Sequence, residues 1–446
     1  MTTPQKKRHP MSWVPTLYVA EGLPFYAVAL ISGLMYKSLG VANDQIAYWT
    51  ALIGLAWVFK CLWSPFLELT GSKKAMIIIT QFIGGISLVL VGLSLKLPAY
   101  FAISLILLGV VAVASATHDI VADGLYIASL SNKQQAEYAG WQGAFYNFAK
   151  LLTLGGLVWL AGHLERQMGA NSAWMIIFTI IGALLVGLGL YHGWALPDVK
   201  RENPEQKAAD VWQTLKEVIA DFFKKPGIWM AIAFIILFRA AEGQIQTIGP
   251  LFLKEAREAG GLGLTNEQIG IAYGTVGSLA FLAGSILGGY FTSWLGLRRA
   301  MLWLILAMNV PNLVFYFLSQ TQPENFYVVL TAISFEMAGY GFGIVGLTLF
   351  VMQVVAPGKF QTAHYALGTG VWQLGFVFFK SISGSVQINL GYKQFFIWVV
   401  LCAIPVLILS RFIDYKDHAQ TEEHEKNTNA ASTDTNQDIK PLTQAS

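Results

Sequence analysis

Two aspartates in an apolar stretch of the sequence, Asp119 and Asp123, are spaced so that they can act together. Residues four apart share one face of a helix, which places both carboxylates in line with Ser115. Two carboxylates on adjacent turns repel when both are ionised, so one of them tends to hold a proton. The pattern predicts a proton-binding site, the alternative being that Asp123 caps a helix end. His118 lies about 100° around the helix from Asp119, so no direct relay is implied.

A second pair of acids, Glu21 and Glu242, interrupts two other apolar stretches, and each is followed by glycine. Pro24 weakens the helix after Glu21 and favours a local break there. Arg239 precedes Glu242 by three residues, which predicts an ion pair within the helix. We expect Asp119, Asp123, Glu21 and Glu242 to be candidates for proton coupling, with a structural ion pair as the alternative for each.

Polar and aromatic residues also form stripes on predicted helices. Gln142, Tyr146 and Lys150 are four apart, and Gln373 and Lys380 are seven apart. Cations beside amides and aromatics suit an anionic or heavily hydroxylated ligand, although either lysine could instead pair with Glu21 or Asp119. The residues predicted to bind a small-molecule substrate are Tyr26, Gln142, Tyr146, Asn147, Lys150, Gln244, Gln373 and Lys380.

The elements that hold these residues are membrane-spanning helices. Hydrophobic residues make up 55% of the 446-residue chain and charged residues 12%, against about 25% charge in a typical soluble domain. Apolar runs long enough to cross about 30 Å of hydrocarbon must be helical, because irregular backbone is not exposed to lipid. Twelve spans are expected, near residues 12–36, 46–67, 75–95, 100–129, 138–162, 172–194, 227–252, 268–293, 300–319, 325–354, 363–387 and 394–414.

The two halves of the chain repeat each other. Ala20-Glu21-Gly22 returns as Ala241-Glu242-Gly243, and Asn43-Asp44-Gln45-Ile46 returns as Asn266-Glu267-Gln268-Ile269. Lys73-Lys74-Ala75-Met76 likewise returns as Arg298-Arg299-Ala300-Met301. The offsets of 221, 223 and 225 residues are nearly constant, which predicts two parallel six-helix repeats with substrate held between them.

The distribution of basic residues predicts the orientation. With the N-terminus inside, 17 Lys and Arg residues lie on the cytoplasmic side of the spans and 6 on the outer side. The positive-inside rule therefore places both termini in the cytoplasm. Repeated basic clusters are expected to act with a nearby acid as a cytoplasmic gate formed by Glu68, Lys73, Lys74, Arg298 and Arg299.

Four segments follow from this pattern. Residues 1–195 are expected to form the N-terminal six-helix bundle, and residues 227–415 the C-terminal one. Residues 196–226 form a polar linker whose middle fits an amphipathic helix on the cytoplasmic membrane surface. Residues 416–446 have almost nothing to bury and are expected to be a disordered cytoplasmic tail.

Three motifs of the first half resemble those of the AmpG-type muropeptide permeases of the major facilitator superfamily. They are Tyr18-x-x-Glu21-Gly22-Leu23-Pro24-Phe25-Tyr26, Lys60-x-x-Trp63-x-Pro65-x-x-Glu68 and Ser115-Ala116-Thr117-His118-Asp119-Ile120-Val121-Ala122-Asp123. The family usually has Asp at the place of Glu68 and Gln at the place of His118. The second half matches through its repeat and its hydropathy.

The resemblance implies proton-linked import of peptidoglycan-derived muropeptides across a bacterial inner membrane. Asn147, Lys150 and Lys380 stand where the better-known permeases are expected to have other residues, and a related branch carries acetyl-CoA. Family membership therefore does not fix the cargo. Amino sugars, small saccharides or another organic solute remain the alternative, since aromatic and amide side chains suit sugar rings.

Other functional classes fit the sequence less well. The run Leu154-Gly155-Gly156-Leu157 lacks the proline expected in the fifth helix of drug antiporters. The seven histidines are scattered and form no metal-ligand motif, so we expect no enzyme, no metal and no cofactor. The net charge of +3 suggests no nucleic-acid partner. The expected partners are a small-molecule substrate, protons and the lipid bilayer around a monomer, and a non-transporting sensor with the same fold is the remaining alternative.

Overall fold

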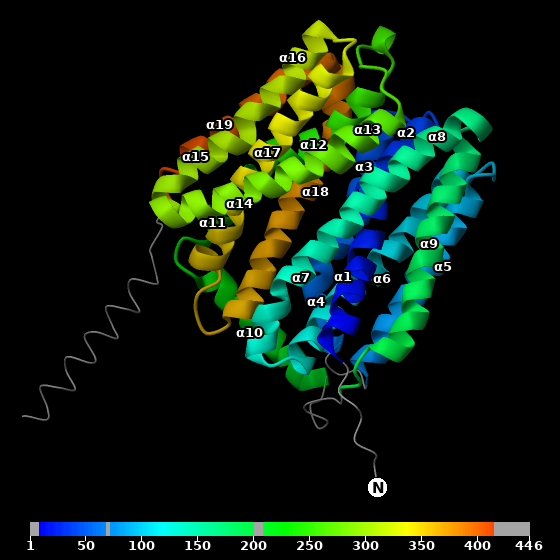
Figure 1. Cartoon of the computed structure of the whole chain (residues 1–446). Helices are drawn as coiled ribbons and strands as arrows, with labels where there is room; N and C mark the ends of the chain where they lie inside the picture. Colours follow the sequence, from blue (N-terminus) through cyan, green and yellow to red (C-terminus); the bar gives the residue numbers. More distant parts are fainter. Residues whose placement is uncertain (1–8, 68–71, 200–207, 414–446) are drawn as a thin grey trace, which may run out of the picture.

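The computed structural model describes residues 9–67, 72–199 and 208–413, and all of its regular elements in these ranges are helical. The N-terminal half consists of six passages (Figure 1). They are η1 Pro10–Ser12, α1 Val14–Tyr26, η2 Ala27–Ile31 and α2 Ser32–Ser38; α3 Asn43–Ile53 and α4 Leu55–Leu67; α5 Lys73–Ser94; α6 Tyr100–Ser129; α7 Asn132–Lys150, η3 Leu151–Leu157 and α8 Val158–Met168; and α9 Ala170–Ala195.

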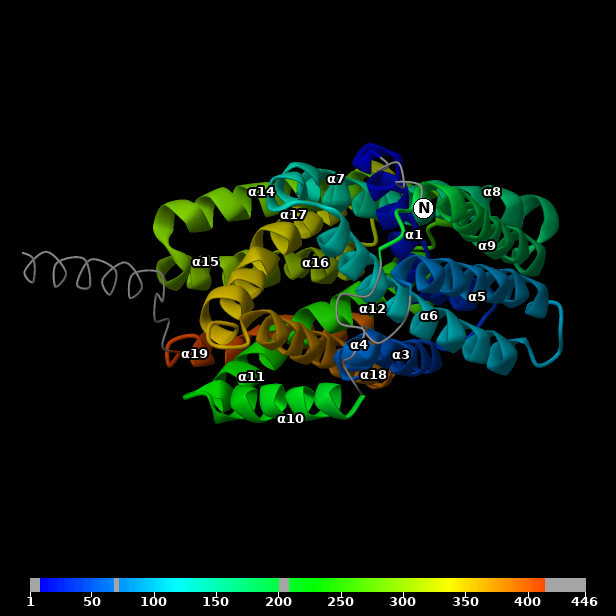
Figure 2. The same ribbon diagram turned by 90° about the horizontal axis from the view of Figure 1, so that it is seen from below.

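The C-terminal half repeats this arrangement. Its passages are α11 Ile228–Phe238 and α12 Ala240–Lys254; α13 Asn266–Ile269, η5 Gly270–Gly277 and α14 Ser278–Leu295; α15 Leu297–Asn309, η6 Val310–Asn312 and α16 Leu313–Thr321; α17 Phe326–Phe350 and η7 Val351–Val355; and α18 Gln361–Leu401 with α19 Ala403–Leu409. The short helix η4 Arg257–Ala259 lies between α12 and α13. Figure 2 shows the two bundles side by side.

Eleven helical stretches among the described residues are long and apolar enough to span a membrane, the last running from Ala363 to Leu409. Gly391 divides that stretch, because its backbone has φ 71° and ψ 163°. Gly169, which separates α8 from α9, has almost the same geometry, φ 79° and ψ 162°. A residue with a Cβ rarely adopts this conformation, so glycine makes each turn possible. The division gives the twelve predicted passages.

The repeated Glu-Gly element has a packing role in both halves. A Cβ on Gly22 would lie 2.7 Å from Ala149 Cβ, and a Cβ on Gly243 would lie 2.8 Å from the Phe376 carbonyl oxygen. Gly22 therefore lets α1 approach α7 closely, and Gly243 lets α12 approach α18 in the same way. The two glycines occupy equivalent positions at equivalent helix crossings.

The apolar core is shared by both halves at one end of the molecule and separate at the other. One large cluster joins residues such as Trp57 and Leu157 with Ile248 and Tyr273. Toward the end where the N-terminus lies, a cluster around Trp13 belongs to the N-terminal half alone, and another around Phe234 belongs to the C-terminal half. The two bundles therefore meet at the face away from the N-terminus, here called the far face, and diverge toward the N-terminal face (Figure 1).

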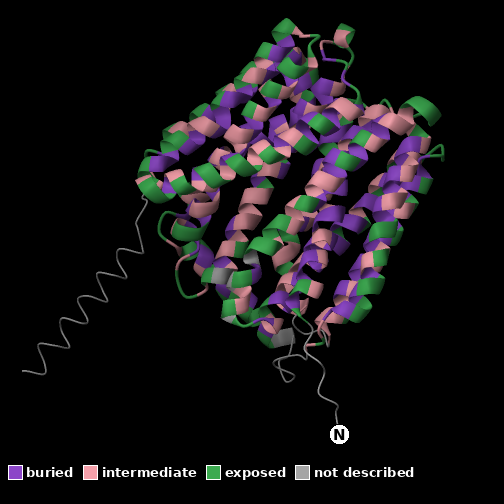
Figure 3. Ribbon diagram, viewed as in Figure 1, coloured by how far each residue is buried: buried purple, intermediate pink, exposed green. Residues whose placement is uncertain are grey.

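Exposed residues lie along much of the outside of the bundle (Figure 3), and many of them are large and apolar. Trp294, Tyr290 and Tyr327 are among the most exposed. Such a surface would be costly in water, and it fits contact with lipid. The acids Glu21, Asp119, Asp123 and Glu242 and the lysines Lys60, Lys150 and Lys380 are, by contrast, buried or half-buried.

The linker contains one described helix, α10 Ala208–Lys224, at the N-terminal face. The rings of Trp212 and Phe66 lie 6.3 Å apart, which connects α10 to α4. Lys225 Nζ donates to the carbonyl oxygens of Val355 and Pro357 at 2.6 and 2.7 Å, at the end of the tenth passage. Burial lowers the pKa of Lys225, and nearby Asp221 opposes that shift. The linker thus contacts both halves, while the predicted tail lies outside the described residues.

Candidate functional site between the two halves

The acids of the N-terminal half form one cluster between α1, α4, α6 and α7. Lys60 forms an ion pair with Asp119. The Tyr18 hydroxyl donates to Asp123 at 2.8 Å, and Gln142 Nε2 lies 3.4 Å from the same carboxylate oxygen. The sequence left Lys150 or Lys380 open as a partner of Asp119, and Lys60 holds that position instead.

Glu21 lies one turn after Tyr18 on α1, and one of its carboxylate oxygens is buried without a hydrogen-bond partner among the described residues. The Lys60 side chain is 35% exposed and that of Asp119 16%, so their ion pair is not sealed from solvent. An acid cluster with one cation and partial access to water can gain and lose protons. Three of the four predicted proton-coupling residues, Glu21, Asp119 and Asp123, are therefore brought together.

His118 points away from this cluster, as its position on the helix predicts. Its Nε2 lies 2.8 Å from Gln81 Nε2, and Gln81 in turn contacts His192 at 2.8 Å. His192 Nε2 lies 3.0 Å from Thr16 Oγ1. All three central side chains are buried, and the network joins α1, α5, α6 and α9 within one bundle. Its geometry is that of an internal polar connection.

The fourth predicted acid, Glu242, lies in the other half. Arg239 and Glu242 form the ion pair that their spacing predicts, and both side chains are almost fully buried. The Arg239 guanidinium also lies 5.3 Å from the centroid of the Trp372 ring and 4.7 Å from that of Phe376. Ring faces attract such a cation, so the pair is held by aromatic packing as well as by charge.

Four aromatic residues surround the middle of the first passage. Tyr26 and Tyr146 have ring centroids 5.4 Å apart, and Phe25 lies 5.2 Å from Trp57 and 6.2 Å from Tyr146. Aromatic faces of this kind stack against sugar rings and other flat or apolar ligand surfaces. Tyr26 and Tyr146, which were predicted separately, thus form one wall.

A small cavity of about 50 Å³ lies between the halves. Both predicted lysines, Lys150 and Lys380, line it, together with three residues that the sequence analysis did not single out, Gln246, Thr247 and Tyr273. Ala29, Gly33 and Thr50 contribute the wall of the N-terminal half. No local sequence signal distinguishes Gln246 from the other polar residues of the seventh passage.

The remaining predicted binding residues are more scattered. Asn147 donates to the Gly143 carbonyl oxygen at 2.9 Å within its own helix, and Gln373 is half-buried on α18. Gln244 is fully buried away from the cavity, where it accepts from Trp398 Nε1 at 3.0 Å and donates to the Ala240 carbonyl oxygen at 2.9 Å. Gln244 therefore contacts the last passage, apart from the other predicted binding residues.

Polar contacts close the far face where the first and seventh passages end. Lys37 forms an ion pair with Glu255 at 2.5 Å and donates to Asn43 at 3.0 Å. Asn43 Nδ2 donates at 2.8 Å to both Gln387 and the Tyr392 hydroxyl. Each of these links except Lys37–Asn43 joins the two halves.

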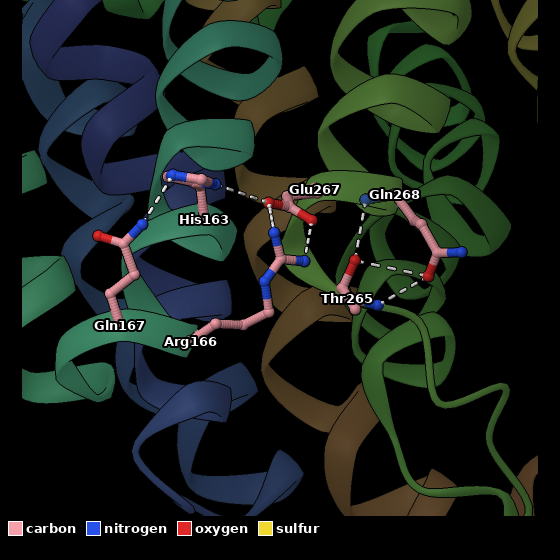
Figure 4. A network of polar contacts seen from close by, with 6 residues as sticks. All are labelled: His163, Arg166, Gln167, Thr265, Glu267 and Gln268. Carbon is pink, nitrogen blue, oxygen red and sulfur yellow. Dashed lines mark hydrogen bonds and ion pairs between the residues drawn. The ribbon is translucent and has the colours of Figure 1, made fainter.

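A second group of contacts lies where the fifth and eighth passages meet (Figure 4). Arg166 makes two bonds to Glu267, at 2.5 and 2.6 Å, and His163 Nδ1 lies 3.6 Å from the same carboxylate. Thr265 caps the following helix through a reciprocal contact with Gln268. Lys254 lies 3.6 Å from Glu165 and donates to Asn266 at 3.0 Å. The repeated Asn-acid-Gln-Ile motif therefore lies at both junctions between the halves.

The predicted cytoplasmic gate residues lie at the opposite end. Lys73 and Lys74 begin α5 and are half-buried, and Arg298 and Arg299 lie in the first turn of α15 and are exposed. Glu68 lies outside the described residues. The structure thus places the two basic pairs at equivalent helix starts, on the face where the bundles diverge.

The chain matches one protein-family model over most of its length. The family model described as Major Facilitator Superfamily covers residues 16–380. The chain belongs to the Major Facilitator Superfamily. It is 25% identical over 402 residues to the anhydromuropeptide permease of Escherichia coli, a match covering 87% of this chain and 77% of the relative. The putative transporter AmpG 4 of Rickettsia conorii is 23% identical over 414 residues, covering 90% of this chain and 95% of the relative.

Solved transporter structures share the fold. A bacterial homolog of the human lysosomal transporter Spinster aligns with a TM-score of 0.70 at 15% identity, covering 92% of this chain and 98% of that one. The xylose transporter XylE of Escherichia coli aligns with a TM-score of 0.67 at 13% identity, covering 91% and 96%. This protein is therefore a multi-pass membrane transporter of the superfamily, with the all-helical, two-repeat architecture that its sequence predicts.

Proposed function

We propose that this protein is a proton-coupled importer of peptidoglycan-derived muropeptides in a bacterial inner membrane. The support for this cargo is the similarity to the anhydromuropeptide permease, which extends over most of the chain. AmpG-type transporters of a second genus match over a comparable length. Both termini are proposed to lie in the cytoplasm, so the N-terminal face is the inner face and the far face is the outer one.

The observation that supports a carrier mechanism is that the two halves are joined at one face and separated toward the other. Ion pairs and amide contacts join the halves at the far face, whereas the core divides into two clusters toward the N-terminal face. A carrier alternates between two such states around a central site. With the proposed orientation, we infer an inward-open state in which the outer gate is closed above the lysine-lined cavity.

The proposed roles follow this division. The acids Glu21, Asp119, Asp123 and Glu242 are proposed to couple protons. The substrate is proposed to lie against Tyr26, Gln142, Tyr146, Asn147, Lys150, Gln373 and Lys380, with Gln244 supporting the helix rather than touching cargo. Glu68, Lys73, Lys74, Arg298 and Arg299 are proposed to close the cytoplasmic side in the opposite state. The transport unit is proposed to be a monomer.

The second candidate cargo is an amino sugar or small saccharide. The aromatic wall formed by Phe25, Tyr26, Trp57 and Tyr146 favours it, because it offers ring faces without requiring a peptide. The same wall accommodates the sugar portion of a muropeptide. Direct measurement of transport is needed to separate the two cargoes.

Uptake by purified protein in liposomes tests the proposal. A labelled anhydromuropeptide should accumulate when the outside is acidic, and a protonophore should abolish accumulation. Accumulation of N-acetylglucosamine instead would establish the saccharide alternative. A protein that moves neither cargo, although correctly folded and inserted, would contradict the proposed transport activity and favour a sensor.

A further inference from the structure

Lys380, which is buried, and Lys150, which is half-buried, differ in their partners from the other cations inside the bundles. Lys60 pairs with Asp119, and Arg239 pairs with Glu242. Lys380 Nζ contacts only the Ala29 carbonyl oxygen, at 3.4 Å, and Lys150 Nζ lies 4.9 Å from the centroid of the Phe281 ring. Among the described residues, neither lysine has a carboxylate within ion-pair distance.

Both lysines line the same cavity although they come from different halves of the chain. Burying an ammonium group without an anionic partner costs several kcal/mol, and one carbonyl oxygen or one ring face compensates little of that cost. Two such cations at one cavity are more costly still, because they repel each other. An anion entering the cavity would remove both penalties at once.

The lysines that line the cavity outnumber the acids beside it. Glu336 is the nearby acid: its Oε1 lies 3.4 Å from Gln246 Nε2, and its Oε2 is buried without a hydrogen-bond partner among the described residues. Gln246 lines the cavity and Glu336 does not. An anion that enters the cavity would therefore meet the two lysines before any described carboxylate.

An independent polar group also points to a ligand. Tyr273 is 3% exposed and lines the cavity, and its hydroxyl has no hydrogen-bond partner among the described residues. A buried hydroxyl is normally hydrogen-bonded, so the unpartnered one of Tyr273, a residue that lines the same cavity as the two lysines, is a donor without an acceptor.

The volume limits what can enter. A cavity of about 50 Å³ holds a few water molecules or one small polar group, not a sugar ring or a peptide. The bulk of a cargo molecule must therefore lie elsewhere, and the aromatic wall of Tyr26 and Tyr146 offers it a surface. Only a terminal group of the cargo reaches the lysines.

We propose that Lys150, Lys380 and Tyr273 form a subsite for a single carboxylate, or a monoanionic group of similar size, on the transported molecule. The inference rests on the proposed muropeptide-type cargo, whose peptide part carries free carboxylates and whose muramyl sugar carries one when the peptide is absent. It adds that recognition of the cargo depends on this one charge. A free small anion would use the same contacts.

Paired ligands test the subsite. Binding of anhydro-N-acetylmuramic acid, which carries one free carboxylate, is compared with binding of its uncharged methyl ester by calorimetry on the purified protein. The acid should bind the wild type at least about tenfold more tightly, the ratio expected for a hydrogen-bonded charge. Lys150→Met/Lys380→Met should bind both ligands equally, at the affinity of the ester for the wild type. Lys393→Met, which changes an exposed lysine just beyond Gly391 at the start of the last passage, should retain the preference.

A second measurement is independent of the cargo. Millimolar acetate should raise the melting temperature of the wild type and of Lys393→Met but not that of the double variant, which should itself melt no lower than the ligand-free wild type. An acetate response without binding of either sugar would support the subsite and refute the cargo. Equal affinity for acid and ester in the wild type, or a double variant that retains the preference, would overturn the subsite. A double variant that melts much lower would make the lysines structural.

Discussion

Gly162 and Gly384 occupy equivalent places at the two junctions that close the far face. A Cβ on Gly162 would lie 2.5 Å from the backbone nitrogen of Glu267, and a Cβ on Gly384 would lie 2.4 Å from Asp44 Cα. Glu267 and Asp44 are the equivalent acids of the repeated Asn-acid-Gln-Ile motif. In each junction the first turn of a helix from one half therefore packs closely against a glycine of the other half. The close approach exists only while the far face is closed.

Replacing either glycine by alanine should open the outer gate without harming the helix. Alanine stabilises a helix by about 1 kcal/mol relative to glycine. Any destabilisation of the closed gate must therefore come from the disturbed contact between the halves. We expect Gly162→Ala or Gly384→Ala to increase labelling of a Gly33→Cys reporter from the outside by an impermeant maleimide. Gly33 lines the cavity below the gate and has room for the added atom, which would lie 3.6 Å from Ile46.

The matched controls are Gly187→Ala and Gly289→Ala, one in each half. A Cβ added at either position would meet no atom within 4 Å outside its own stretch of helix. Both variants should therefore leave labelling of the reporter unchanged. Unchanged labelling in the gate variants as well would show that these contacts do not hold the gate closed.

The two ion pairs of the outer gate, Lys37–Glu255 and Arg166–Glu267, should differ in how strongly they stabilise the closed gate. The side chains of Lys37 and Glu255 are 13% and 24% exposed, whereas Arg166 is 58% exposed. Exposed pairs contribute about 0–1 kcal/mol, and loss of a partner costs more as burial increases. Lys37→Met should therefore increase labelling of the Gly33→Cys reporter several-fold, and Arg166→Met by less than about fivefold. The reverse order would contradict the argument from burial.

Orientation remains a prediction from the basic residues. Reporter fusions after Lys207 and after Ser446 should both behave as cytoplasmic, because the loops beside them hold most of the Lys and Arg residues. A fusion near Glu258 should report the outer compartment. Enzymatic reporters active only on one side of the membrane provide the measurement. An outer signal at position 207 would rule out two parallel six-helix halves.

The architecture could be predicted well because membrane spans and repeated motifs are recognisable in short stretches of the sequence. The last two spans were predicted near residues 363–387 and 394–414, and Gly391, whose φ is positive, separates the two passages between those ranges. The Arg239–Glu242 pair was also predictable, since residues three apart on a helix are neighbours. Such features need only the spacing along one helix.

Contacts between helices were not predictable in the same way. Lys60 and Asp119 meet because α4 packs on α6. The residue spacing along either helix does not show how the two helices are aligned with each other. The seventh passage shows the same difficulty: Gln244 faces Trp398 within the bundle, and Gln246 faces the cavity. A helix buried on all sides lacks the polar stripe that would reveal which glutamine faces a ligand. The packed structure was needed to find the cavity and the Tyr273 hydroxyl, which has no hydrogen-bond partner among the described residues.

The Lys60–Asp119 pair would set the condition for the proposed proton coupling. In this structure Lys60 is the ion-pair partner of Asp119. If Asp119 binds a proton in another conformation, the proton must replace Lys60 as the partner of Asp119. Lys60 would then be released, and protonation would be linked to the packing of α4 on α6. Glu21, whose second oxygen has no hydrogen-bond partner among the described residues, lies in the same cluster.

Asp119→Asn should separate uphill transport from exchange. Asparagine keeps the size and hydrogen bonding of aspartate but cannot titrate. With a neutral cargo, one proton per cycle at about 150 mV supplies roughly 3.5 kcal/mol, which allows a few-hundredfold accumulation. We expect the variant to lose proton-driven accumulation in liposomes while exchange between equal pools of cargo continues. Asp221→Asn, which alters a carboxylate on α10, should leave both activities intact. If exchange and accumulation fall together, Asp119 binds cargo or supports the fold, and the proton site must be sought at Glu21 or Glu242. If neither falls, the Lys60–Asp119 pair is a structural contact without a part in coupling.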